Sequence, residues 1–177
     1  MQPKNPPDIH FPGFQPVDPW KSEDLTYSCR KLPHLEVPRA TYFVTFRCQR
    51  GIQLPSRARD LIMAAIEACS GKSIDLDAAV VMPDHAHVIF RLVEPHRLSG
   101  VLRQIKGRSA RQVNQLLQQN HRLKPVPLWM EESFDHIVRH EAELDEKIEY
   151  IRQNPVRSGL VTKPEQYRWL MTRKITS

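Results

Sequence analysis

The chain has 177 residues, of which 40% are hydrophobic and 26% are charged, so it can bury one core without disulfide cross-links. Its cysteines, Cys29, Cys48 and Cys69, form no CxxC pair, which argues against a zinc knuckle or a disulfide framework and indicates a reducing cytoplasm. The net charge of +6 favours a polyanionic partner such as nucleic acid, and residues 1–14 lack the apolar run of a signal peptide or membrane span.

Prolines are concentrated at the start of the chain. Residues 1–38 hold eight of the fifteen prolines and show little apolar periodicity, which predicts an extended or partly disordered arm. We expect one compact domain over residues 39–170, followed by a short tail over residues 171–177.

The first half of the compact region predicts three strands and one helix. The β-branched and aromatic run over residues 41–48 is typical of a strand. Ser56 can cap a helix that runs to about Cys69, because apolar residues recur there at helical spacing. Residues 74–82 and 85–92 predict a hairpin with a tight turn at Pro83 and Asp84.

The second half predicts a long helix from about Leu98 to Gln119, a strand over residues 134–139 and a final helix over residues 141–154. Pro155 should stop that helix, because proline disfavours helical geometry in the residue before it. The resulting order is typical of the ferredoxin-like (RRM-like) α+β fold, an antiparallel sheet with helices on one face. Many binding modules share this fold, so it does not define a function.

A basic stripe lies on the long helix and just after it. Between residues 101 and 125 there are six cations and no acid, namely Arg103, Lys106, Arg108, Arg111, Arg122 and Lys124. Arg103, Lys106 and Arg111 fall off the apolar stripe of the helix and should face outward. This pattern predicts contacts with a nucleic-acid backbone, and the alternative is a solvated helix face.

Two histidines begin the third predicted strand, in the string MPDHAHVIF over residues 82–90. Residues two apart on a strand point to the same face, so His85 and His87 should project side by side and could hold one divalent ion. Ala86 should face the core. A lone HxH pattern is more often two histidines with unrelated hydrogen bonds, so the metal hypothesis needs further ligands.

The final predicted helix could supply them. Tyr150 and Asn154 lie four residues apart and therefore share one stripe of the helix. If that stripe meets the histidines, Asn154 can be a third ligand and Tyr150 can reach a metal-bound phosphate. A phenol has a pKa near 10 and needs a neighbouring cation to become a good nucleophile. Considered alone, Tyr150 would be a packing residue and Asn154 a helix-end residue.

These strings resemble a known family. MPDHAHVIF resembles the HUH motif of the single-tyrosine transposases, and EYIRQNPVRSGLV, over residues 149–161, resembles the tyrosine-helix motif of their REP-associated branch. Further similarities are PHLEVPRATYFVTFRC (33–48), KGRS (106–109), and Trp129 followed by FDHIVR (134–139). The resemblance covers about residues 33–169. One departure is Ala86, because the residue between the histidines is usually bulky.

The resemblance implies an HUH endonuclease fold and cleavage of single-stranded, hairpin-forming DNA through a 5′-phosphotyrosine. Carried over by position, His85, His87 and Asn154 hold Mg²⁺ or Mn²⁺, and Tyr150 is the nucleophile. We expect Arg103, Lys106, Arg108 and Arg111 to contact DNA. The family implies a monomer or a homodimer.

Other functions remain open at this point. A non-catalytic nucleic-acid-binding module should carry aromatic residues on its sheet, whereas the informative strand carries histidines. Phosphoesterases with paired HxH motifs need two of them, and this chain has one. Replication initiators and relaxases use the same HUH chemistry but are usually larger.

Overall fold

The computed structural model describes residues 26–29, 33–121 and 125–173. Residues 1–25 of the arm predicted over residues 1–38, and residues 174–177 of the predicted tail, lie outside this description. The part of the arm that is described contains two short paired strands instead of only extended chain. The elements in chain order are β1 (Thr26–Cys29), β2 (Pro33–Glu36), β3 (Thr41–Cys48), α1 (Ser56–Glu67), β4 (Ile74–Val81), β5 (His85–Leu92), α2 (Leu98–His121), β6 (Trp129–Val138), α3 (Glu141–Arg157), a 3₁₀ turn (Pro164–Gln166) and β7 (Leu170–Thr172). Among the described helices, none is long and apolar enough to cross a membrane.

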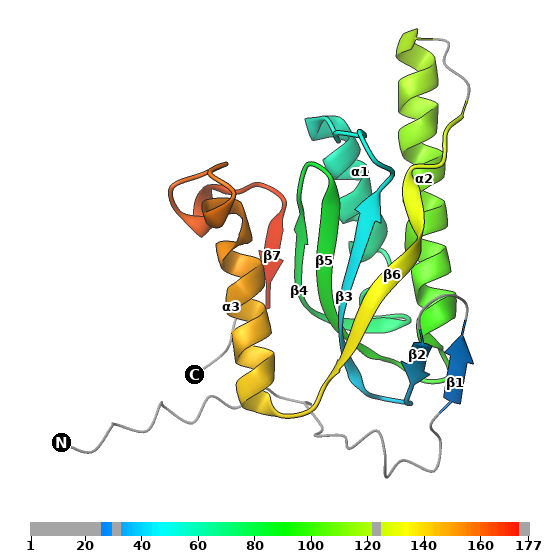
Figure 1. Ribbon diagram of the computed structural model, residues 1–177, viewed down its shortest axis with the longest axis vertical. Coiled ribbons are helices and arrows are strands. Elements are labelled where there is room, and N and C mark those ends of the chain that lie inside the picture. The colour runs from blue at the N-terminus through cyan, green and yellow to red at the C-terminus, as the bar shows by residue number, and fades with distance from the viewer. Residues whose placement is uncertain (1–25, 30–32, 122–124, 174–177) are drawn as a thin grey trace, which may run out of the picture.

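Five strands form one sheet, in the order β6-β3-β5-β4-β7, and every neighbouring pair is antiparallel (Figure 1). Strands β6, β3, β5 and β4 follow the split arrangement of a ferredoxin-like fold, which confirms the predicted α+β class. β4 and β5 form the predicted hairpin, closed by a hydrogen bond from Met82 N to His85 O of 2.8 Å. β1 and β2 pair separately as a small hairpin.

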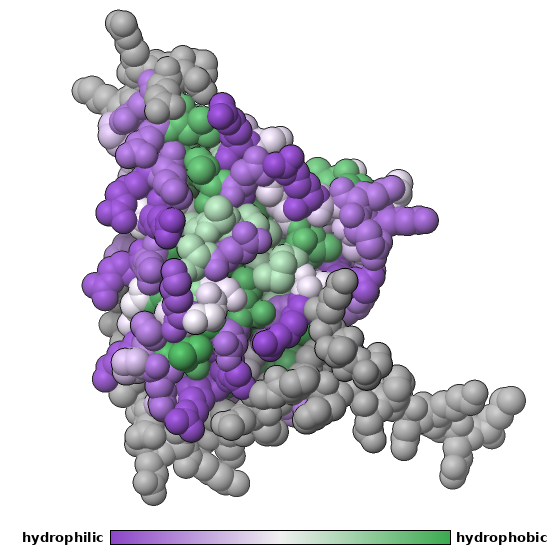
Figure 2. All heavy atoms as spheres, turned by 180° about the vertical axis from the view of Figure 1, so that it is seen from behind, coloured by the Kyte–Doolittle hydropathy of each residue, from purple (hydrophilic) through white to green (hydrophobic). Residues whose placement is uncertain are grey.

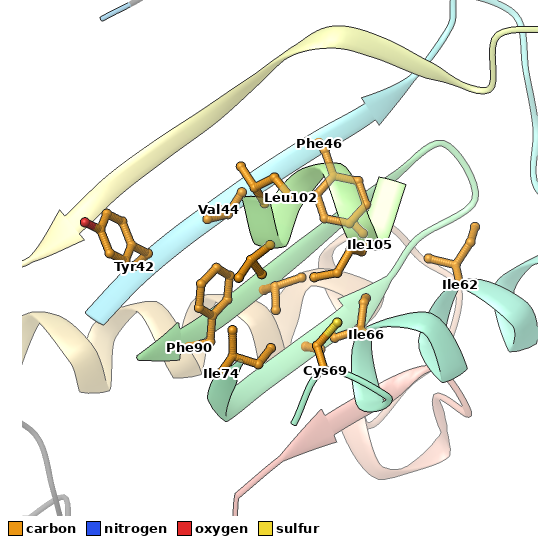
Figure 3. Packing of buried hydrophobic residues seen from close by; sticks show 14 of the residues in the cluster. Tyr42, Val44, Phe46, Ile62, Ile66, Cys69, Ile74, Phe90, Leu102 and Ile105 are labelled. Atoms are coloured by element: carbon orange, nitrogen blue, oxygen red, sulfur yellow. The ribbon is translucent and has the colours of Figure 1, made fainter. Parts of the chain in front are cut away.

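One face of the sheet is covered by α1 and α2. Figure 3 shows Tyr42, Val44 and Phe46 of β3 on this side, together with Phe90 of β5 and residues of both helices. Ala86 lies in the same core and is fully buried, as its place between the histidines predicts. The outer surface of this side is largely hydrophilic, with apolar atoms along its middle (Figure 2).

The other face is covered in part by α3. Leu144, Ile148 and Ile151 of this helix pack on Val80 and Ile89 of the sheet. The expectation of helices on one face only is therefore wrong. The physical reason is that consecutive residues of β4 and β5 are apolar, so these strands require cover on both sides.

The end of α3 also differs from the prediction. Pro155 lies inside the helix, where the missing N–H removes only one hydrogen bond close to the helix end. The helix ends instead in a Schellman motif, with hydrogen bonds from Leu160 N to Pro155 O (3.0 Å) and from Gly159 N to Val156 O (2.9 Å). Gly159 adopts a φ of 68°, which favours glycine.

Three further details depart from the sequence prediction. The residue before α1 is Pro55, with no side-chain cap, so Ser56 does not cap this helix. β6 begins at Trp129 rather than at residue 134, across a register shift opposite Phe46 and Cys48. β7 was not predicted, and it pairs with the edge of β4 from Ala78 to Val80.

Candidate active site

His85 and His87 lie side by side at the start of β5, on the face that α3 covers. Their ring centroids are 4.7 Å apart and the rings meet edge to face. His87 pairs across the sheet with Thr45 of β3 and with Val80 of β4, so its backbone is held between two neighbouring strands. The alternation of a strand therefore produces the predicted pair of imidazoles.

Each imidazole has one nitrogen engaged by an oxygen of the chain. His85 Nδ1 lies 2.6 Å from Asp84 Oδ1, and His87 Nδ1 lies 2.7 Å from Thr45 Oγ1. If each Nδ1 donates its proton to that oxygen, each Nε2 presents a lone pair. Such contacts to the second nitrogen are the usual way in which a protein orients a metal-binding histidine.

His87 is neutral at physiological pH. Its pKa is lowered to about 3, mainly because burial disfavours the charged ring. Electrostatic interactions with His85 and Arg47 add to this lowering of the His87 pKa, whereas the carboxylate of Asp84 opposes it. A neutral imidazole is the form that binds metals.

Tyr150 of α3 lies directly against this pair. Its ring centroid is 5.3 Å from that of His87 and 6.0 Å from that of Phe43, with edge-to-face geometry in both contacts. The guanidinium of Arg157 lies 5.8 Å above the Tyr150 ring, and the tyrosine is 38% exposed. Tyr150 and Arg157 line an open cleft of about 540 Å³, together with Phe43, Lys147 and three carboxylates of α3.

Asn154 lies one helical turn after Tyr150 and is buried, with 8% of its surface exposed. Its Oδ1 atom and the Nε2 atom of His87 are buried and make no hydrogen bond to any described residue. Buried polar atoms are normally paired, and these two atoms are of the kinds that can bind a metal ion. The described residues contain no group of three or more His, Cys, Asp or Glu side chains arranged for a metal. Two imidazoles and an amide oxygen are a set that Mn²⁺ accepts, so His85, His87 and Asn154 fit a divalent ion.

The basic residues predicted to contact DNA lie elsewhere, on α2 and therefore on the opposite face of the sheet. Arg103, Arg108 and Arg111 are exposed. Lys106 is half-exposed, and its ammonium donates to Met130 O (2.8 Å), Glu131 O (2.8 Å) and Ser133 Oγ (3.1 Å) of β6.

Trp129 also lies on the α2 side, where it is buried. Its Nε1 donates to Ser109 Oγ at 3.0 Å, and its ring packs edge to face on Phe46. It is therefore a core residue and cannot stack on DNA bases. Neither Trp129 nor the stripe on α2 forms part of the histidine–tyrosine site.

Comparison with known proteins identifies the family of this chain. A family model described as a transposase like that of IS200 matches residues 42–154, which is more than half of the chain and includes both histidines, Tyr150 and Asn154. The chain belongs to the IS200-like transposase family. Members of this family are enzymes of the single-tyrosine HUH type, so the resemblance drawn from the motifs is confirmed.

This IS200-like transposase is similar to a candidate REP-associated tyrosine transposase of Haemophilus influenzae (strain ATCC 51907 / DSM 11121 / KW20 / Rd). The two are 22% identical over 100 residues, which make up 54% of this chain and 57% of that relative. The matched region therefore spans less than two thirds of the relative's length.

Among solved structures, a REP-associated tyrosine transposase bound to a REP hairpin matches with a TM-score of 0.65 and 20% identity, over 84% of this chain and 94% of that one. This likeness confirms the fold. A candidate transposase from Deinococcus radiodurans matches with a TM-score of 0.47 and 21% identity, over 70% of this chain and 94% of that one.

Sequence reasoning missed two residues that touch the site of this IS200-like transposase. Thr45 holds His87 from a strand 42 residues earlier in the chain, and no local pattern links the two. Arg157 stands seven residues after Tyr150, so it lies on the same side of α3 two turns later. The seven-residue spacing from Tyr150 could therefore have identified Arg157 from the sequence.

Proposed function

We propose that this transposase cleaves and rejoins single-stranded, hairpin-forming DNA, with Tyr150 as the nucleophile and a divalent metal held by His85, His87 and Asn154. The observation that carries the proposal is the contact of the Tyr150 and His87 rings, 5.3 Å between centroids, together with two buried atoms that make no hydrogen bond within the described part of the chain. All four side chains come from one copy of the chain. Hairpin DNA as substrate is supported by the solved relative, whose structure holds a REP hairpin.

In the proposed reaction, the Tyr150 oxygen forms a bond to the scissile phosphorus as the bond from phosphorus to the 3′ oxygen breaks. The phenol proton is transferred overall to the departing oxygen, which leaves a free 3′-hydroxyl and a 5′-phosphotyrosine. The reverse attack by a 3′-hydroxyl rejoins strands without a nucleotide cofactor. When bound, the metal would polarise the phosphate and stabilise the leaving charge.

The chain's own residues contribute orientation and charge to this reaction. α3 fixes the phenol beside the imidazoles, because its apolar stripe packs on β4 and β5. The cation of Arg157, 5.8 Å from the Tyr150 ring centre, can attract a phosphate of the substrate. Such positioned charges are an effective way to accelerate phosphoryl transfer.

The test is covalent capture of labelled single-stranded hairpin DNA with Mn²⁺, followed by a denaturing gel. Wild-type protein should give a protein–DNA adduct, and Tyr150→Phe should give none while still binding DNA. Tyr167→Phe is the matched control, because it removes a phenol whose hydroxyl instead donates to Val81 O, and its adduct should persist. An undiminished adduct in Tyr150→Phe would reject the nucleophile. DNA binding that is insensitive to both Mn²⁺ and His87→Ala, with no adduct, would indicate a binding module.

A further inference from the structure

The face of the sheet that carries the histidines is only partly covered. α3 packs toward β4, β5 and β7, and in Figure 1 no described helix lies in front of the middle of β3 and β6. Phe134 stands on this open area and is 56% exposed. Single exposed apolar residues are common, so the exposure of Phe134 is informative only because of where the residue lies.

Phe134 lies in the same cross-strand row as the site. It pairs with Thr45, and Thr45 pairs with His87 on the other side. Side chains in one such row point to the same face, so Phe134 is two strand spacings, about 10 Å, from His87. By contrast Phe43, the other aromatic residue of this region, is 7% exposed and packs on Tyr150.

Arg47 adds an exposed cation to the same area. It pairs with His85 and lies two residues after Thr45 on β3, so it points to the histidine face. An exposed aromatic ring beside a cation is the combination with which proteins hold single-stranded nucleic acid, the base stacking on the ring and the phosphate meeting the charge.

We propose that Phe134 and Arg47 form a subsite for one nucleotide of the single strand that flanks the scissile phosphate. The base stacks on Phe134 and the neighbouring phosphate pairs with Arg47. Because Phe134 lies about 10 Å from His87, the stacked base belongs to a nucleotide only a few positions along the strand from the cleaved bond. The subsite rests on the proposed function, because it takes the cleaved strand as its occupant.

The test measures binding without chemistry. Single-stranded hairpin DNA carrying 2-aminopurine at successive flanking positions is titrated with protein in EDTA. Wild-type protein should quench the fluorescence strongly at one position. Phe134→Leu should lose that quenching and bind about tenfold more weakly, whereas Phe134→Trp should retain both. Arg47→Gln should weaken binding and reduce the slope of log affinity against log salt by about 0.7.

Met130→Leu is the matched control. Met130 lies on the same strand and is 45% exposed, but it lines the groove beside α2. This variant should bind and quench like the wild type, and all variants should unfold at similar temperatures. Unchanged affinity and quenching in Phe134→Leu would overturn the subsite. A change in sedimentation of the free Phe134→Leu protein, with DNA binding intact, would overturn it in favour of contact with a second copy.

The adduct assay separates this proposal from the proposed function. Quenching that depends on Phe134, with no adduct from wild-type protein in Mn²⁺, supports the subsite and rejects strand cleavage. If wild-type protein forms an adduct and the quenching does not depend on Phe134, the subsite is rejected and strand cleavage is supported.

Discussion

Replacing Asn154 with leucine should make the metal-free protein more stable and destroy its activity. The Asn154 Oδ1 atom is buried and makes no hydrogen bond to any described residue. Leaving a buried polar atom unpaired costs about 1–3 kcal/mol, and leucine of similar shape removes that cost. Each kcal/mol shifts the melting temperature of a domain this size by about 2–4 °C, so in EDTA the Tm should rise by about 2–12 °C.

With metal bound, the wild type should instead be more stable than Asn154→Leu. A metal that binds only the folded state stabilises the wild type by about 4.1 kcal/mol when its free concentration is about a thousand times Kd, which exceeds the advantage of Asn154→Leu. Asn154→Leu should lack most of this gain and should form no covalent adduct. Scanning calorimetry in EDTA and in Mn²⁺ measures both effects. Gln153→Leu removes a half-buried amide that donates to Glu149, so it should gain no stability in EDTA and should keep the Mn²⁺ shift. A lower Tm for Asn154→Leu in EDTA, or an undiminished Mn²⁺ shift, would refute the reasoning.

Three further predictions concern other parts of the molecule. The pKa of Glu143 is lowered, because hydrogen bonds from Arg139 N and His136 outweigh the raising effect of burial. This stability is present above the carboxyl's unfolded pKa and is lost as the pH falls through the folded value. Glu143→Gln should therefore cost about 1.5–3 kcal/mol of unfolding free energy at pH 7 and progressively less below pH 4, as denaturant titrations at several pH values would detect. Burial raises the pKa of Cys48 to about 12, so the native thiol should resist iodoacetamide at pH 8 and react after denaturation, as peptide mass spectrometry would reveal. Arg111→Gln should lower hairpin-DNA affinity and reduce the salt slope by about 0.7–0.9 if α2 contacts the backbone; an unchanged slope would assign that face to solvent.

The local parts of the site could be predicted from the sequence because each depends only on the side-chain periodicity of a single strand or helix. Residues two apart on a strand share a face, and this alone brings together the rings of His85 and His87. Residues four apart on a helix share a stripe, which aligns Tyr150 with Asn154. That these two stripes meet is a tertiary fact, and the motif resemblance, not the spacing, was what indicated it.

The missed features depend on contacts between distant segments. The position of α3 opposite α1 and α2 follows from two-sided burial of β4 and β5, which a short apolar run does not distinguish from one-sided burial. Lys106 falls on an outward stripe of α2, yet β6 passes beside it and offers two carbonyls. Helical periodicity shows which residues avoid the sheet but not which other strand lies beside them.

Thr45 offers the sharpest test of how the site is held, because it touches His87 without touching the proposed metal. Its Oγ1 lies 2.7 Å from His87 Nδ1 in a part-buried contact. If the ring donates from Nδ1, Nε2 is free for the metal, and Thr45→Val removes the acceptor that fixes this tautomer with little change of shape. Loss of such a contact typically weakens metal binding by about 10–100-fold.

Isothermal titration with Mn²⁺ should detect the weakened binding in Thr45→Val and near-normal binding in Thr45→Ser, which keeps the oxygen. DNA affinity in EDTA should be the same in both variants, because neither alters a residue proposed to contact DNA. A purely structural role would instead lower the Tm of Thr45→Val and leave its Mn²⁺ affinity unchanged. That result would mean that the Thr45 hydroxyl does not set the tautomer of His87 that binds the metal.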